Sequence, residues 1–140
     1  AAWDSKYYYD LWRPYTAIRN ADIDGNNKTV AEPDWEPLLE NPPFQEYVSG
    51  HTTFCAAAAE ILAYEFGDEA TFIVIPYTSD LAPRAYGSFS AAARECSLSR
   101  IYGGVHYRFA GDAAYKMGEE IARIASLHYM RPLPPRREAH

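Results

Sequence analysis

Three short motifs supply the side chain types that bind a tetrahedral oxyanion. Lys6 and Arg13 form the first, the Ser-Gly-His of residues 49–51 forms the second, and Arg100 with His106 forms the third. Arginine binds such anions through two parallel N–H bonds, and a histidine can serve as nucleophile or ligand once its other ring nitrogen is fixed. The motifs therefore predict a local, phosphate-like pocket.

A helix is expected to position the second motif. Ser49 is a suitable N-cap, and apolar residues at helical spacing follow as far as Gly67, which can end the helix. Unpaired N–H groups and the dipole at the start of this helix favour an anion. The missing side chain of Gly50 lets an oxyanion come close.

The first motif is predicted to lie on a helix from Lys6 to Arg19, which Pro14 kinks or restarts. Lys6 and Arg13 are seven residues apart, which is two turns along one helix face. Both side chains could then reach toward a common point.

The other segments predict an all-α fold with little sheet. Residues 21–48 contain four prolines and a polar turn and are expected to form a long ordered loop. Residues 71–75 are expected to form at most a minor hairpin, and residues 90–102 a helix closed by two glycines; residues 131–140 are an irregular tail. A long final helix carries one predicted stripe, made of His106, Ala110, Ala113, Met117, Ile121, Ile124 and His128.

Composition limits the class of protein. The chain has 140 residues, enough for one domain, and 48% of them are hydrophobic, enough for a core. A net charge of -6 argues against a nucleic-acid or anionic-membrane surface, and no apolar run is long enough to span a bilayer. Any positive site must therefore be local.

Taken together, the motifs resemble the signature of the type 2 phosphatidic acid phosphatase and vanadium-dependent haloperoxidase superfamily. The matching patterns are Lys6-x6-Arg13-Pro14, Ser49-Gly50-His51 and Ser99-Arg100-x5-His106. The sequence segments around the motifs are more similar to those of bacterial haloperoxidase-like proteins than to those of lipid phosphatases. These segments are WDSKYYYDLWRP, NPPFQEYVSGHTTF and SRIYGGVHYRF. The resemblance implies a helical bundle of this type, with residues 1–140 as a single domain that is its C-terminal, active-site-bearing part.

The resemblance also implies a role for each motif residue. The counterpart of His106 is bonded to vanadium or attacks phosphorus, and the counterpart of His51 is the acid–base group. Trp3 and Phe44 resemble the aromatic residues on the halide side of the pocket. The oxygens of vanadate, or of phosphate in the same site, would be bound by Lys6, Arg13, Ser49, Gly50 and Arg100.

The implied activity is that of a vanadate-dependent haloperoxidase, which uses hydrogen peroxide to oxidise a halide at a histidine-bound vanadate. An acid phosphatase that hydrolyses phosphate monoesters through a phosphohistidine would use the same residues. A non-catalytic oxyanion-binding domain is a third interpretation. The sequence does not determine the cellular compartment of the protein. Only the family resemblance favours a secreted or periplasmic location.

The chain departs from the family pattern at three places. Val48 stands where proline is usual, and Ala110 stands where many members carry an aspartate that orients the histidine. Asp112 lies two positions after Ala110 and is not expected to replace that aspartate directly. The second ring nitrogen of His106 therefore needs another hydrogen-bond partner, which could be a carbonyl, a water or another acid. The family also packs helices ahead of the first motif. We therefore expect a companion chain, a clipped N-terminal segment or a second copy to supply them.

Simpler interpretations exist for single residues. Arg13 could lie on the surface, His51 could be a capping or core residue, and His106 could be an ordinary buried histidine. His128 shares the stripe of His106 but lies 22 residues further along, so we interpret it as structural. Residues 20–25 imitate a calcium loop, although a polar turn fits them better.

The two cysteines lie one helical turn from motif residues. Cys55 follows His51, and Cys96 precedes Arg100. If the motifs converge, the two sulfurs could be neighbours, and the sequence leaves both a disulfide and two free thiols open.

Overall fold

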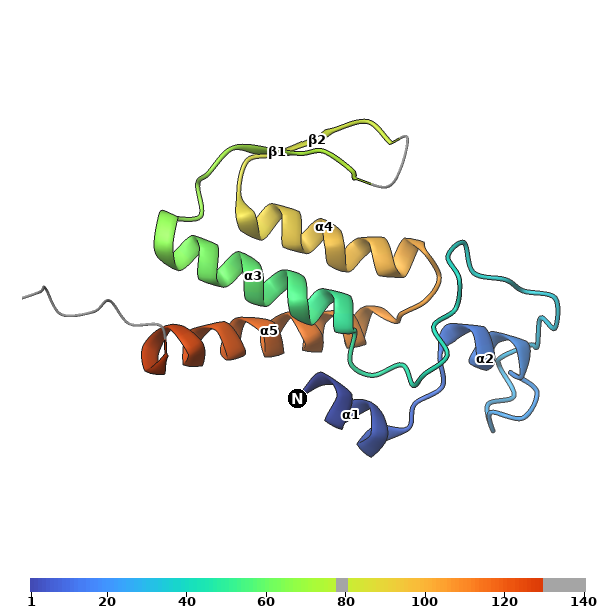
Figure 1. The fold of residues 1–140 in the computed structure, drawn as a ribbon. Helices are drawn as coiled ribbons and strands as arrows, with labels where there is room; N and C mark the ends of the chain where they lie inside the picture. The colour runs from blue at the N-terminus through green and yellow to red at the C-terminus, as the bar shows by residue number, and fades with distance from the viewer. Residues whose placement is uncertain (78–80, 130–140) are drawn as a thin grey trace, which may run out of the picture.

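The computed structural model describes residues 1–77 and 81–129, so the tail predicted at 131–140 lies outside the described residues. Three helices form the body of the molecule, with α3 packed on both α4 and α5, and α4 in contact with α5 (Figure 1). The helices are α1 (Ala2–Tyr9), α2 (Pro14–Arg19), α3 (Gly50–Phe66), α4 (Phe89–Tyr102) and α5 (Arg108–His128). The all-α prediction is confirmed.

The start and end of α3 are those predicted. Ser49 is the N-cap, and its side chain accepts a hydrogen bond from the Thr52 N–H. Gly67 follows the last helical residue with a φ of 80°, a conformation that favours glycine. The helix therefore presents its free N-terminal amides beside the second motif.

The first motif does not lie on one helix face. Pro14 restarts the helix, as predicted, but α1 has already ended at Tyr9, and Asp10 adopts the left-handed conformation. Arg13 is extended, with φ −71° and ψ 159°, because a residue before proline is kept out of the helical region. Lys6 and Arg13 therefore reach the site from a helix and from an extended N-cap.

The stripe predicted for the last helix is wrong in two respects. The helix α5 begins at Arg108, so His106 lies in the preceding turn. Ile121 and Ile124 are 40% and 42% exposed. The buried face instead consists of small residues, namely Ala110, Gly111, Ala114, Gly118 and Ala122. Small residues let α5 approach α3 closely, and this contact decides which face is buried.

Little else is regular. The strands β1 (Phe72–Val74) and β2 (Arg84–Tyr86) form an antiparallel pair, which confirms the minor hairpin. This hairpin lies over the start of α4 (Figure 1). No helix or strand lies in residues 20–49, all of which the structure describes, so the long loop is also confirmed. Within it, the Asp24 carboxylate accepts bonds from the Asn26 N–H and the Thr29 hydroxyl, which form a polar turn.

Cys55 and Cys96 form a disulfide that joins α3 to α4, with their Cα atoms 6.6 Å apart. Among the described residues, no helix is both long and apolar enough to cross a bilayer. Phe109 and the outer isoleucines of α5 are exposed, but the expectation of a companion chain or second copy stays a prediction.

Replacing Gly118 by alanine should destabilise the fold. The added Cβ would lie 2.5 Å from the Thr53 carbonyl oxygen and 2.8 Å from the Ala56 Cβ. Alanine gains about 1 kcal/mol of helix propensity over glycine, but overpacking against a backbone atom costs about 1–3 kcal/mol. Because the added Cβ meets a backbone oxygen that cannot easily move, we expect Gly118→Ala to lower the free energy of unfolding, by up to about 2 kcal/mol, in denaturant titrations. Gly87→Ala, where the new Cβ meets nothing within 4 Å, is the control and should change it by less than about 0.5 kcal/mol.

Candidate functional site

Lys6 ties α1 to the loop before α3. Its side chain is 2% exposed, and its ammonium group donates to the carbonyl oxygens of Gln45, Glu46 and Val48 at 3.0, 3.0 and 2.6 Å. An ammonium group has three N–H donors, so these bonds use all of them. Lys6 therefore contributes its charge to the site, while its N–H groups hold the loop.

Arg13 joins the first motif to the other two. Its guanidinium donates to the carbonyl oxygens of Phe44 and Gln45 in the loop, and to that of Val105 at 2.8 Å. Val105 directly precedes His106, so one buried side chain binds both the loop and the turn that carries the third motif. Arg13 is 3% exposed, which excludes its interpretation as a surface residue.

The turn between α4 and α5 is packed against the long loop. A Cβ on Gly103 would lie 2.5 Å from the Leu39 side chain, and the Leu39 N–H bonds the Gly103 carbonyl at 3.1 Å. Gly104 has a φ of 74° and lies against Pro37. This conformation turns the chain back toward the end of α4, so that the His106 backbone nitrogen donates to the Arg100 carbonyl oxygen at 3.3 Å. The loop thus fixes the third motif from outside.

Glu46 is a candidate functional residue that the motif analysis missed. Its carboxylate Oε1 lies 2.7 Å from His106 Nδ1 and accepts the Tyr107 N–H at 3.0 Å, and Glu46 is fully buried. Of the three partners expected for the second nitrogen of His106, namely a carbonyl, a water or another acid, the structure shows the acid. No helical period relates position 46 to position 106. One feature of the sequence could nevertheless have indicated the acidic partner, because Glu46 is the only acid between Glu40 and Glu60, in the segment that contains the second motif.

The start of α3 offers neutral donors. Ser49 is fully buried, and its Oγ accepts from the Thr52 N–H at 3.4 Å and from the Thr52 hydroxyl at 3.0 Å. Because Oγ accepts both bonds, its own proton is available to donate. A Cβ on Gly50 would meet nothing within 4 Å, so the approach to its N–H is open.

The cations of the three motifs influence one another. Burial lowers the pKa of Lys6 to about 8, with a further lowering by Arg13, and burial lowers that of Arg13 to about 10. Arg100 also has a lowered pKa because it is buried, and its Nε has no hydrogen-bond partner among the described residues. Glu46 offsets part of the positive charge by raising the pKa of both Lys6 and Arg13. The cluster favours an additional anion.

Both histidines are held in the neutral form. Burial lowers the pKa of His51, and the charges of Arg100 and Arg13 lower it further. The pKa of His106 is also lowered, chiefly by burial and further by the charges of Arg13 and Lys6, although Glu46 acts in the opposite direction. A neutral His106 that donates its Nδ1 proton to Glu46 keeps an unprotonated Nε2, the form that binds a metal or attacks phosphorus.

The two predicted aromatic residues lie beside the cations. The Trp3 and Phe44 rings have centroids 4.8 Å apart. The Phe44 ring lies 5.2 Å from Lys6 Nζ and 4.8 Å from the Arg13 guanidinium carbon, within cation–π range. Trp3 is 51% exposed, so this pair borders the cluster on a side that is open to solvent.

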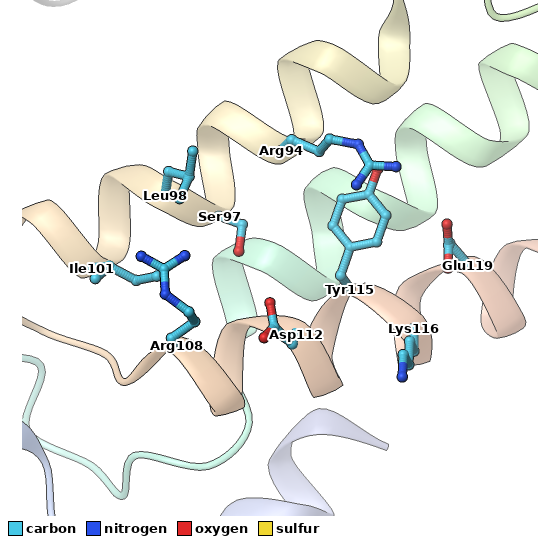
Figure 2. A pocket seen from close by; sticks show the side chains of 9 residues that line it. All are labelled: Arg94, Ser97, Leu98, Ile101, Arg108, Asp112, Tyr115, Lys116 and Glu119. Atoms are coloured by element: carbon cyan, nitrogen blue, oxygen red, sulfur yellow. The ribbon is translucent and has the colours of Figure 1, made fainter.

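A groove of about 540 Å³ between α4 and α5 is separate from these residues. Figure 2 shows Asp112 and Arg108 of α5 facing this groove, with Arg94 of α4 over the Tyr115 ring. Asp112 therefore does not replace the family aspartate. Ala110, at the aspartate position, is fully buried, and its carbonyl oxygen lies 3.5 Å from the Ser49 nitrogen.

The family is established by comparison of sequences. The sequence model described as "VCPO second helical-bundle domain" matches residues 1–134. The chain belongs to this family. The resemblance inferred from the three motifs is thereby confirmed.

Bacterial vanadium haloperoxidases have the same fold. One, described as the first bacterial vanadium-dependent iodoperoxidase, superposes with a TM-score of 0.73 at 39% identity, over 87% of this chain and 28% of its own. A holo-type bacterial vanadium-dependent chloroperoxidase superposes with a TM-score of 0.72 at 27% identity, over 89% of this chain and 31% of its own. The chain thus spans about a third of the length of these haloperoxidases. No curated protein sequence matches it.

Replacing Glu46 by glutamine tests how the carboxylate acts on His106. Glutamine keeps the shape and an acceptor oxygen but removes the charge that raises the His106 pKa. We therefore expect the His106 pKa to fall further in Glu46→Gln, as followed by NMR titration of the ring nitrogens. The matched control Glu36→Gln removes an exposed carboxylate paired with Arg19 and should leave this pKa unchanged. A raised His106 pKa in Glu46→Gln would contradict the assignment.

Proposed function

We propose that the chain carries the oxyanion site of a vanadate-dependent haloperoxidase, in which hydrogen peroxide oxidises a halide. The observation that carries the proposal is the bond between Glu46 and His106 Nδ1 beside a buried cluster of cations. The 39% identity to a protein described as a vanadium-dependent iodoperoxidase favours this chemistry over phosphate-ester hydrolysis.

The residues present fit vanadate. Its negative charge would offset the charges of Lys6, Arg13 and Arg100, whose pKa values are all lowered by burial. The buried and unpartnered Nε of Arg100 is an available donor. When bound, vanadate supplies a Lewis-acidic centre that activates peroxide toward halide.

Each side chain then has a defined task. His106 Nε2 would be the protein ligand to vanadium, since Glu46 holds the proton on Nδ1. The Ser49 hydroxyl, the Gly50 N–H and the arginines would bind the oxygens. His51, neutral and at the exposed start of α3, would accept the proton of incoming peroxide. Trp3 and Phe44 would border the halide.

Histidine substitutions separate binding from turnover. His106→Ala should abolish retention of orthovanadate, because it removes the only proposed protein ligand to vanadium. His51→Ala should keep orthovanadate but lose about 10²- to 10⁴-fold in peroxide-dependent bromination of a phenol-type dye, the usual contribution of general acid–base catalysis. His128 is an exposed histidine at the end of α5, so the control His128→Ala should change neither the retention of orthovanadate nor the rate of bromination.

Orthovanadate binding alone does not identify the reaction, because a phosphatase would bind it as a transition-state analogue. Hydrolysis of a phosphate monoester by vanadate-free protein, without bromination by the loaded form, would favour an acid phosphatase. Binding without either turnover would favour a non-catalytic oxyanion-binding domain.

The titration of His51 in the vanadate-free protein should reflect the buried cations. Burial and the charges of Arg100 and Arg13 place its pKa below the ordinary value of 6.5. We therefore expect the ring nitrogens of His51 to stay mostly neutral at pH 6.5 and to become protonated only at lower pH, as followed by NMR titration between about pH 4 and 8. We also expect added orthovanadate to raise this pKa, because it offsets the two arginine charges. A midpoint above pH 6.5 in the vanadate-free protein would contradict the assignment.

A further inference from the structure

The disulfide lies next to the proposed oxyanion site. Cys55 is four residues after His51 on α3, and Cys96 is four residues before Arg100 on α4, so each lies about 6 Å along its helix from a motif residue. The Cys96 Sγ lies 3.8 Å from the His51 carbonyl oxygen. A bridged sulfur has no proton, so this is a packing contact of α4 against the first turn of α3.

The three cations of the site differ in how they are held. Lys6 and Arg13 each donate to three backbone carbonyls, which fix their positions. Arg100 has no such anchor within the described residues, and its buried Nε is unpartnered. The direction of its side chain therefore depends on where the backbone of α4 lies relative to α3.

The backbone at Arg100 has two constraints. On one side, its carbonyl accepts the N–H groups of Val105 and His106 at 3.1 and 3.3 Å, which connect it to the turn. On the other side, one turn earlier along α4, the disulfide connects it covalently to α3. Both cysteines are partly exposed, so a reductant can reach the bridge.

We propose that the disulfide between Cys55 and Cys96 positions Arg100 against the start of α3, so that breaking it weakens binding of the oxyanion. Cys55 and Cys96 are then positioning residues that act through Arg100. This inference rests on the proposed function, because it takes Arg100 as a ligand to the anion.

The test is a double-mutant cycle on the full chain. The variant with Cys55→Ser and Cys96→Ser needs no reductant, which would itself reduce vanadate. We expect it to bind orthovanadate about tenfold more weakly than the oxidised protein by isothermal titration calorimetry, equivalent to about 1.4 kcal/mol. In an Arg100→Ala background, which already lacks the positioned group, the same pair of serines should change the affinity by about twofold or less.

Two controls separate positioning from general stability. Ala122→Gly, in the buried face of α5 and away from the bridge, should lower the melting temperature but leave orthovanadate affinity unchanged. If the serine pair does not fold by circular dichroism, the oxidised and reduced forms of the unmutated protein are compared with inorganic phosphate as the probe. The reduced form should bind phosphate about tenfold more weakly.

The outcomes distinguish this inference from the proposed function. If the oxidised protein binds neither orthovanadate nor phosphate, the oxyanion site itself is wrong, and the inference is wrong with it. If the oxidised protein binds and the bridge-free protein binds equally well, only the inference is overturned. An equal loss of affinity in both Arg100 backgrounds would also overturn it, because the bridge would then act through another residue.

Discussion

Two buried cations bonded to backbone carbonyls hold the three motifs together. Lys6 and Arg13 are almost fully buried, which is costly for a charge unless hydrogen bonds replace the lost water. The carbonyls of the loop before α3 provide those bonds, and the carbonyl of Val105 adds the turn before His106. Carbonyl oxygens carry only partial negative charge, so the cluster stays positive. The bonds that assemble the site therefore also create its preference for an anion.

Glu46 makes the surroundings of the two histidines in the positive cluster different. Among the residues that the structure describes, its carboxylate is the one negative charge that raises the pKa values of Lys6, Arg13 and His106 together. It binds only one nitrogen of His106, so the other nitrogen is left for chemistry. His51 has no acidic partner within hydrogen-bond reach in the described part of the chain, and the arginine charges keep it neutral for a different reason. Two histidines in the same protonation state thus suit different tasks.

The helical core supports the site at one end. Close packing of α3 on α5 requires glycine or alanine at the contact, as at Gly118, whose Cβ would collide with the Thr53 carbonyl. The same packing brings the Ala110 carbonyl to the backbone of Ser49. The capped start of α3 is thereby fixed against the start of α5, and the disulfide fixes α4 beside both. The contacts of three helices therefore fix the position of the α3 start relative to α4 and α5.

The sequence alone determined what is local or depends on residue type. Ser49 and Gly67 delimit α3 through their own capping chemistry, Pro14 restarts a helix because it lacks an N–H, and the motif residues have the charges that an oxyanion needs. Tertiary structure decided the rest. The partner of His106 is 60 residues away at Glu46, and no local period relates them. The buried face of α5 was set by the close approach of α3, which favours small residues over the larger apolar ones that the pattern suggested. Both outcomes depend on contacts between distant segments, which form only when the whole chain packs.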